Sequence, residues 1–275
     1  MTRNVLITGG NSGIGYEMAL ALAQQGDRVI IAARGEQKSQ EAVARIRAAV
    51  PNAQIESLPL DLADFASVDR FAAAALKKMP VIDVLILNAG LYTLKLGKLA
   101  NGYESMMGVM HFGHFRLVQH LLPAVQAAAQ GRIVVTSSMM HQLGRIDEAS
   151  FTDPSRHRSG MHAYGQAKLA NLLFTRELAR RLKNTGVTVN AFHPGAVATD
   201  IYRQLPGFLQ PLIRLTMLTP AQGADTAVWL ATAPELAKVS GEYFIKRKQK
   251  AGSALSRDAE LARQLWQISE AAMPA

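Results

Sequence analysis

The sequence predicts an α/β fold: one doubly wound domain, residues 1–275, around a mainly parallel seven-stranded sheet. Short runs rich in valine and isoleucine alternate with longer segments of helical period, as in parallel strands joined by crossover helices. Most runs are apolar on both faces of the pleat, which a sheet covered by helices on both sides requires. The expected strands are Asn4–Thr8, Arg28–Ala33, Gln54–Leu60, Val81–Asn88, Arg132–Ser137, Thr188–His193 and Glu242–Ile245.

The composition limits the possible functions. Of the 275 residues, 49% are hydrophobic and 19% are charged, which provides enough apolar material for a buried sheet. The absence of cysteine excludes disulfides, thiolate metal sites and a cysteine nucleophile. The net charge of +9 comes from scattered lysines and arginines with one dense run, KRKQK at 246–250. We interpret that run as solvated surface and expect no nucleic-acid partner.

Two stretches bear on contact with a membrane, the N-terminus and Ile201–Thr219. Residues 1–4 lead directly into the first strand without room for a signal peptide, and no run of 18 apolar residues exists. We therefore expect a cytoplasmic protein without a transmembrane segment. Ile201–Thr219 mixes apolar residues with prolines and arginines, which predicts a flap over an apolar substrate and also allows contact with a membrane surface.

A glycine-rich turn, TGGNSGIG, follows the first expected strand and precedes a helical stretch. Glycines permit a tight turn and let the backbone approach a pyrophosphate at a helix N-terminus. The spacing is G-x-x-x-G-x-G, because Met18 stands where many dinucleotide sites have a third glycine. A plain turn and a methyltransferase loop are alternatives, but the position favours a Rossmann dinucleotide site. The residues expected at the cofactor are Gly9, Asn11, Ser12, Gly13, Ile14 and Gly15.

The second expected strand leads directly into Arg34, where a fold that binds NAD usually has an acidic residue for the ribose hydroxyls. An arginine can instead pair with a 2′-phosphate in a fork geometry. The sequence therefore predicts NADP rather than NAD, with an ordinary exposed arginine as the alternative.

Tyr164 and Lys168 are four residues apart at the start of a helical stretch, which places the phenol and the ammonium on one face. A neighbouring cation favours the phenolate and lowers the pKa of a tyrosine from about 10. Such a phenol can exchange a proton with a substrate oxygen. Taken alone, the pair is common and more often an ordinary helix-surface pair than a catalytic one.

Together these motifs resemble the short-chain dehydrogenase/reductase family over essentially the whole chain. They occur in the family's order: TGGNSGIG, Asp61-Leu62, Asn88-Ala89-Gly90, Ser137-Ser138, YGQAK and His193-Pro194-Gly195. The resemblance implies that Ser138 holds the substrate oxygen, that Tyr164 is the acid/base, and that Lys168 lowers its pKa and binds the nicotinamide ribose. It further implies cofactor contacts from Asp61, Leu62, Asn88, Ala89, Gly90, Pro194, Gly195, Val197 and Thr199.

The stretches GVMHFGHFRL, SSMMH, KLANLLFTRELARRL and HPGAV resemble the retinol dehydrogenase-like branch of that family. The resemblance implies an enzyme that interconverts an apolar aldehyde or ketone and its alcohol, and Arg34 predicts that it uses NADP(H). It also implies a homodimer built on the helices near Val109–Gln126 and Tyr164–Leu182. Membrane-bound retinol enzymes carry an anchor before the first strand, whereas this chain begins at the strand, so we expect a soluble relative.

One position departs from that branch. Where the family has an asparagine before His-x-x-His-Phe, this chain has Met110. In the family the asparagine's carbonyl holds a water at the lysine and its side chain steadies the helix; Met110 keeps only the carbonyl. We favour an enzyme whose proton relay runs through the main chain, because Ser138, Tyr164 and Lys168 are retained. The alternative is a catalytically weakened NADPH-binding regulatory protein.

Two other chemistries receive less support. His111, His114 and His120 are spaced by three and six residues, which is not the i,i+4 pair of H-E-x-x-H zinc sites. We expect these histidines to pack or to form hydrogen bonds, and we predict no metal site. A hydrolase would need a G-x-S-x-G elbow or an acid-then-histidine order, and Ser138 has neither.

Overall fold

Eight strands form one sheet in the computed structural model, which describes residues 2–195 and 218–273. They are β1 (Asn4–Thr8), β2 (Arg28–Ala33), β3 (Ile55–Pro59), β4 (Val84–Leu87), β5 (Arg132–Thr136), β6 (Thr188–His193), β7 (Tyr243–Ile245) and β8 (Lys248–Lys250). Their order is β3-β2-β1-β4-β5-β6-β7-β8, and every neighbouring pair is parallel except β7 and β8. The order reverses between β1 and β4, where sheets of this kind bind ligands. The predicted doubly wound α/β class is therefore confirmed.

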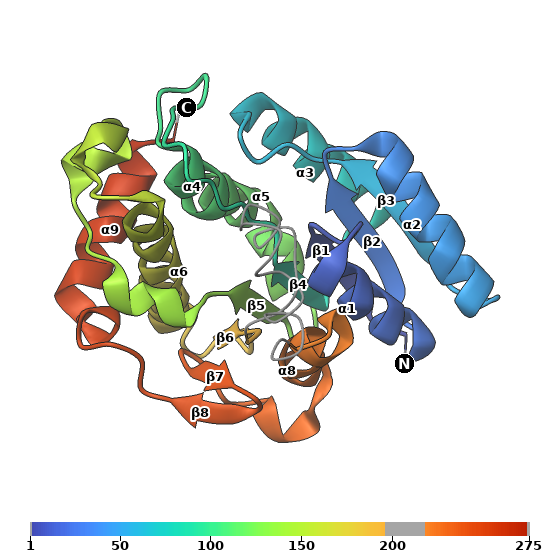
Figure 1. The fold of residues 1–275 in the computed structure, drawn as a ribbon. Coiled ribbons are helices and arrows are strands. Elements are labelled where there is room, and N and C mark those ends of the chain that lie inside the picture. The colour runs from blue at the N-terminus through green and yellow to red at the C-terminus, as the bar shows by residue number, and fades with distance from the viewer. Residues whose placement is uncertain (1, 196–217, 274–275) are drawn as a thin grey trace.

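Helices cover both faces of the sheet (Figure 1). The helices α1, α2 and α8 lie on one face, α3, α5 and α6 lie on the other, and α9 packs outside α5 and α6. Their bounds are α1 (Gly13–Gln24), α2 (Glu36–Ala49), α3 (Phe65–Lys78), α4 (Ser105–Met107), α5 (Gly113–Gln126), α6 (Gly160–Arg181), α8 (Pro220–Thr232) and α9 (Ala259–Ala271).

The central strands are apolar on both sides because each side meets a helix layer. In β1, Val5 and Ile7 join the core beneath α1 and α8, whereas Leu6 joins the core beneath α5 and α6. All three side chains are fully buried. This alternation in a continuous apolar run is what a parallel sheet between two helix layers demands.

The strand β8 was missed by the sequence analysis, which expected seven strands and read 246–250 as solvated surface. Lys246 and Arg247 form a turn in the left-handed region, with φ of 50° and 58°. Lys248–Lys250 then pair antiparallel to β7 at the edge of the sheet, and all three residues are exposed. Charged edge strands lack the apolar pattern that reveals a strand in a sequence, although lysines at an edge discourage pairing with other chains.

The helix α9 covers part of the helix pair on which the sequence analysis placed a homodimer. Trp266 lies with its ring centroid 4.9 Å from that of Phe115 in α5 and stacks on Phe174 of α6 at 5.8 Å. The guanidinium of Arg181 lies 4.3 Å from the centre of the Trp266 ring. A dimer built on α5 and α6 would therefore have to include α9, and the homodimer stays a prediction.

The predicted flap at 201–219 lies outside the described residues, apart from Leu218 and Thr219. Thr219 is the N-cap of α8, and its hydroxyl accepts a hydrogen bond from the backbone of Gln222 in a capping box.

Candidate active site

The glycine-rich turn between β1 and α1 leaves the backbone accessible at the N-terminus of α1. Gly9 and Gly13 adopt φ of +69° and +54°, which glycine alone adopts without strain. A side chain at Gly15 would stand 2.1 Å from the carbonyl oxygen of Gly9. Ser12 is the N-cap of α1 and makes no side-chain capping bond to any described residue, so the first N–H groups of α1 are left for an anion.

The two other predicted residues of this turn flank that cradle. The Asn11 amide donates a hydrogen bond to the Ser39 hydroxyl at 3.2 Å, which ties the turn to α2. Ile14 is half-buried in the first turn of α1. The geometry therefore fits the pyrophosphate of a dinucleotide.

Asn88, Ala89 and Gly90 follow β4 directly beside this turn. The Asn88 amide donates to the carbonyl oxygen of Thr8 at 3.0 Å. The backbone N–H groups of Asn88 and Ala89 both donate to the Thr8 hydroxyl, at 2.9 and 3.0 Å. Thr8 therefore joins the ends of β1 and β4 at the point where the strand order reverses.

Arg34 directly follows β2 and is exposed in the short turn that leads to α2. Among the described residues, none forms an ion pair or a hydrogen bond with its guanidinium. An exposed arginine at this strand end is available for a phosphate that extends from the α1 turn.

Asp61 and Leu62 follow β3 at the same edge of the sheet. The Asp61 carboxylate accepts a hydrogen bond from the backbone of Ala63 at 3.0 Å, so one of its oxygens shapes the local turn. Leu62 is buried, and its carbonyl oxygen lies 2.4 Å from where a side chain at Gly113 would begin. The absence of a side chain at Gly113 thus allows α5 to approach this loop.

Ser138 follows β5 and is held in extended backbone, with φ of −157°. Its hydroxyl accepts a hydrogen bond from the backbone N–H of Met140 at 3.2 Å, and the hydroxyl proton is left for another acceptor. The next turn packs closely on α6, because a side chain at Gly144 would stand 2.3 Å from the carbonyl oxygen of Gly165. This close approach brings the Ser138 loop against the residue that follows Tyr164.

Tyr164 and Lys168 lie on the same face of α6, as the spacing predicts. The Lys168 ammonium lies 5.5 Å from the centre of the Tyr164 ring, and Tyr92 meets that ring edge-on at 5.6 Å. Lys168 is 3% exposed and donates to the carbonyl oxygen of Thr136 at 3.1 Å. Burial lowers the pKa of Lys168 from 10.5 to about 8. Tyr164 thus has a buried, easily deprotonated cation beside it.

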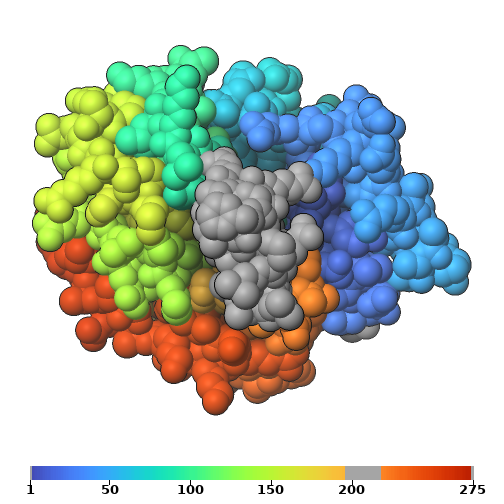
Figure 2. Space-filling view, in the orientation of Figure 1, coloured from blue at the N-terminus to red at the C-terminus, as the bar shows by residue number. Residues whose placement is uncertain are grey.

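Exposed apolar side chains gather on the segments that carry Ser138 and Tyr164. Figure 2 shows the green segment after β4 and the yellow-green segment before α6 adjoining on one face of the molecule. The backbone confirms this contact, because a side chain at Gly160 would stand 2.4 Å from the carbonyl oxygen of Thr93. Large apolar side chains are exposed here: Leu94 lies on the segment after β4, Met139 and Leu143 lie between β5 and α6, and Met161 lies in the first turn of α6.

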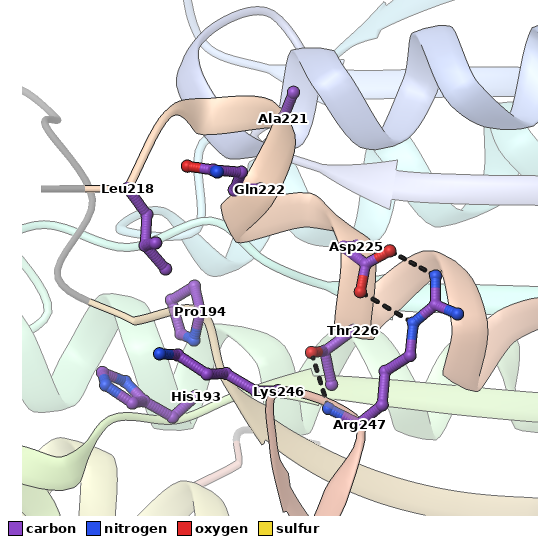
Figure 3. A pocket seen from close by; sticks show the side chains of 9 residues that line it. All are labelled: His193, Pro194, Leu218, Ala221, Gln222, Asp225, Thr226, Lys246 and Arg247. Atoms are coloured by element: carbon purple, nitrogen blue, oxygen red, sulfur yellow. Dashed lines mark hydrogen bonds and ion pairs between the residues drawn. The ribbon is translucent and has the colours of Figure 1, made fainter.

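A cavity of about 470 Å³ opens where β6 ends, between α8 and the turn that joins β7 to β8 (Figure 3). His193, Pro194 and Gln222 line it, and the Lys246 side chain extends toward His193 and Pro194. Gly195 has φ of +92°, and Leu218 lies 2.4 Å from where its side chain would begin. Pro194 and Gly195 thus lie at the end of β6, and their contact with a cofactor stays a prediction. Val197 and Thr199 lie outside the described residues.

Comparison with known proteins identifies the family. Residues 3–207 match the family model described as short chain dehydrogenase. The chain belongs to the short-chain dehydrogenase family. Retinol dehydrogenase 12 of Mus musculus is 41% identical over 267 residues, which covers 96% of this chain and 84% of that protein. Retinol dehydrogenase 13 of Homo sapiens is 39% identical over 272 residues, with coverage of 96% and 82%.

A solved structure has a similar fold. The crystal structure of an uncharacterized protein from Mycobacterium Paratuberculosis has 34% sequence identity and a TM-score of 0.79, covering 98% of this chain and 92% of that chain. Membership of the short-chain dehydrogenase family makes this protein an oxidoreductase that uses a nicotinamide dinucleotide and a small-molecule substrate. The hydrolase interpretation therefore loses its basis, and no finding supports a regulatory protein.

The segment with the unusual Met110 is a π-helix, Gly108–Phe112, that leads into α5. Such wider turns are frequent at functional sites. Met110 is fully buried, and its sulfur lies 3.1 Å from where a side chain at Gly90 would begin; the Lys168 ammonium lies 3.7 Å from the same point. The Met110 thioether thus lies near Lys168, in the space where the family resemblance leads us to expect the side-chain amide of an asparagine.

The three histidines form hydrogen bonds, as predicted. His111 and Ser269 are 2.7 Å apart, His114 and Thr8 are 2.9 Å apart, and His120 lies 2.8 Å from Asp69. Within residues 2–195 and 218–273, no group of three or more potential metal ligands converges. No helix in the same part of the chain is long and apolar enough to cross a membrane.

The sequence analysis missed two side chains that shape the site. The Thr8 hydroxyl organises the Asn88 loop. His141 lies between two segments: its Nδ1 is 2.6 Å from the Ser138 carbonyl oxygen, and its Nε2 accepts a hydrogen bond from the backbone N–H of Ser253 at 3.0 Å. Thr8 was visible as the first letter of the glycine motif. The contact between His141 and Ser253 spans 112 positions and has no local signal.

Proposed function

We propose that this protein is an NADP(H)-dependent oxidoreductase that interconverts an apolar aldehyde or ketone and its alcohol. The observation that carries the chemistry is the group formed by Tyr164, the buried Lys168 and the Ser138 loop at the carboxyl edge of the sheet. NADPH, when bound, supplies the hydride for the substrate carbon.

The chain's own residues handle the substrate oxygen. Ser138 donates its free hydroxyl proton in a hydrogen bond to that oxygen, and Tyr164 donates a second one and then transfers its proton. The phenolate that remains is stabilised by the Lys168 ammonium. Because burial brings the pKa of Lys168 to about 8, this side chain can also exchange a proton near neutral pH.

The preference for NADP rests on Arg34. Its exposed guanidinium has no ion-pair partner among the described residues and stands where an acidic residue would favour NAD. Arg34→Asp should weaken NADPH binding about 10- to 100-fold, since hydrogen bonds to charged groups contribute about 1.5–3 kcal/mol. NADH binding should stay the same or improve.

Titration of both cofactors into the wild type and Arg34→Asp tests this preference. Lys183→Asp is the control, because it makes the same charge change at an exposed site after the far end of α6. Equal losses of NADH and NADPH affinity in Arg34→Asp would refute the assignment of Arg34 to the 2′-phosphate.

The apolar substrate is supported by Leu94, Met139, Leu143 and Met161, which expose apolar surface on the segments around Ser138 and Tyr164. A carbonyl compound with a long apolar chain should therefore have a lower KM than a short polar one. Met139→Ser should raise the KM for the apolar compound and leave that for the polar compound unchanged. Equal KM values for both compounds in the wild type would contradict an apolar substrate.

The cytoplasmic location stays a prediction.

A further inference from the structure

His114 lies in α5 with 3% of its surface exposed and connects two parts of the site. Its Nε2 is 2.9 Å from the Thr8 hydroxyl, and its Nδ1 is 3.0 Å from the carbonyl oxygen of Met110. His114 is not part of a metal site among the described residues, and the catalytic group of Ser138, Tyr164 and Lys168 does not include it.

The direction of each hydrogen bond follows from counting protons. The Thr8 hydroxyl accepts from the backbone N–H groups of Asn88 and Ala89, which occupies both of its lone pairs. Its single proton is then donated to His114 Nε2 at 2.9 Å, since the other acceptor, the Ile86 carbonyl, is farther away at 3.4 Å. Nε2 accepts, so the neutral ring carries its proton on Nδ1 and donates it to the Met110 carbonyl.

The environment keeps the ring in this neutral form. Burial, with a smaller contribution from the nearby Lys168 ammonium, lowers the pKa of His114 to about 4, although the hydrogen bond to the Met110 carbonyl acts in the opposite direction. Near neutral pH the chain of hydrogen bonds from the Asn88 loop to Met110 is therefore complete, with one donor and one acceptor at each contact.

We propose that His114 is a positioning residue that couples the Asn88–Ala89 loop to the main-chain carbonyl of Met110, a residue whose side chain lies near Lys168. This inference rests on the proposed function, since the loop is expected to hold the cofactor and Lys168 to serve the chemistry. Met110 brings no polar side-chain group of its own to this helix, so the His114 ring supplies the bond that fixes its carbonyl.

His111 provides a matched control on the same stretch of chain. It is also 3% exposed, and its Nε2 also bonds to a hydroxyl, that of Ser269 in α9 at 2.7 Å. His111→Phe and His114→Phe remove the same chemistry from neighbouring positions. A merely structural role predicts similar consequences for both, whereas a positioning role predicts that only His114 affects the cofactor loop.

The first measurement is hydrogen exchange of the ligand-free protein. In His114→Phe, exchange should become faster in residues 86–90, because the Thr8 hydroxyl loses the acceptor that orients it. In His111→Phe, exchange should instead become faster near Ser269. This readout needs no cofactor and no turnover, so it tests the His114 link even if the proposed function fails.

NADPH titration is the second measurement. His114→Phe should weaken binding about three- to tenfold, as expected for the loss of one or two buried hydrogen bonds, and His111→Phe should change it less than about twofold. Thr8→Val should weaken binding too. In the double variant Thr8→Val/His114→Phe, the loss of NADPH affinity should be little larger than in either single variant, because Thr8 and His114 are in contact. In Thr8→Val/His111→Phe, the two losses should add, because Thr8 and His111 are not in contact.

Two conservative variants separate the halves of the connection and guard against loss of folding. His114→Gln can still reach the Thr8 hydroxyl, so it should keep NADPH affinity while lowering kcat; His114→Asn can still reach the Met110 carbonyl and should do the reverse. The inference would be overturned if the hydrogen-exchange rates, the NADPH affinity and kcat changed only in proportion to the loss of overall stability, and did so alike in the His111 and His114 variants. Wild-type protein that binds no NADPH would overturn the proposed function instead.

Discussion

Lys168 carries a positive charge in a nearly sealed part of α6, and its replacement by methionine tests whether that charge is kept there for chemistry. Burial lowers its pKa from 10.5 to about 8. A difference of one pKa unit corresponds to about 1.4 kcal/mol, so the charged lysine destabilises the folded state by about 3 kcal/mol at pH 7. Methionine has a similar length and no charge.

The sign of the pH dependence follows from the two pKa values. Below about pH 8 the lysine is charged in both the folded and unfolded states, and its full cost is present. Between about 8 and 10.5 the folded protein releases the proton first, so the cost shrinks as the pH rises. Lys168→Met should therefore be more stable than the wild type by up to about 3 kcal/mol at pH 7, and by about half of that at pH 9.5.

Urea denaturation at both pH values measures this difference, with Lys183→Met as the control at an exposed position. Activity should be lost in Lys168→Met and kept in the control. The Thr136 carbonyl remains paired in the variant, because the Asn171 amide also donates to it at 3.0 Å. A Lys168→Met protein that is less stable than the wild type, or a difference that does not change with pH, would refute the reasoning.

Two further substitutions test the cofactor turn and the packing of α9. Gly15→Ala should weaken NADPH binding about 10- to 100-fold, because the added carbon would lie 2.1 Å from the Gly9 carbonyl oxygen. Gly97→Ala is the control, because the position has room for a side chain, and it should bind NADPH normally. A normal NADPH affinity in Gly15→Ala would contradict the role of this turn in cofactor binding. Trp266→Ala should lower the free energy of unfolding by about 3–5 kcal/mol in urea, because the ring packs on α5 and α6; a loss below about 1 kcal/mol would show that α9 is only loosely attached.

The fold was predictable where hydrophobic pattern and neighbouring elements agree. The strands β1, β2 and β6 have the bounds that the sequence predicts. The fourth strand is shorter than expected, Val84–Leu87 instead of Val81–Asn88, because its flanks bond to other groups. The Asp83 carboxylate accepts from the backbone of Asn4 at 2.7 Å, and Asn88 turns to Thr8.

The candidate site was predictable as a set of motifs and only partly as a set of contacts. The i,i+4 spacing placed Tyr164 and Lys168 on one face, since helical periodicity is local. The partners of the buried histidines lie far along the chain: His114 meets Thr8 106 positions away, and His111 meets Ser269 158 positions away. No local pattern in the sequence carries such pairings, because the packing of the sheet and helices decides them.

The measurement that tests the account most directly is turnover by the purified protein. NADPH oxidation would be followed by absorbance with long-chain apolar aldehydes and ketones, beside Tyr164→Phe and a second phenol-to-phenyl change, Tyr103→Phe. We predict turnover in the wild type and Tyr103→Phe and its loss in Tyr164→Phe, with NADPH binding retained in all three. Equal turnover in Tyr164→Phe and the wild type would contradict the assignment of the proton to Tyr164.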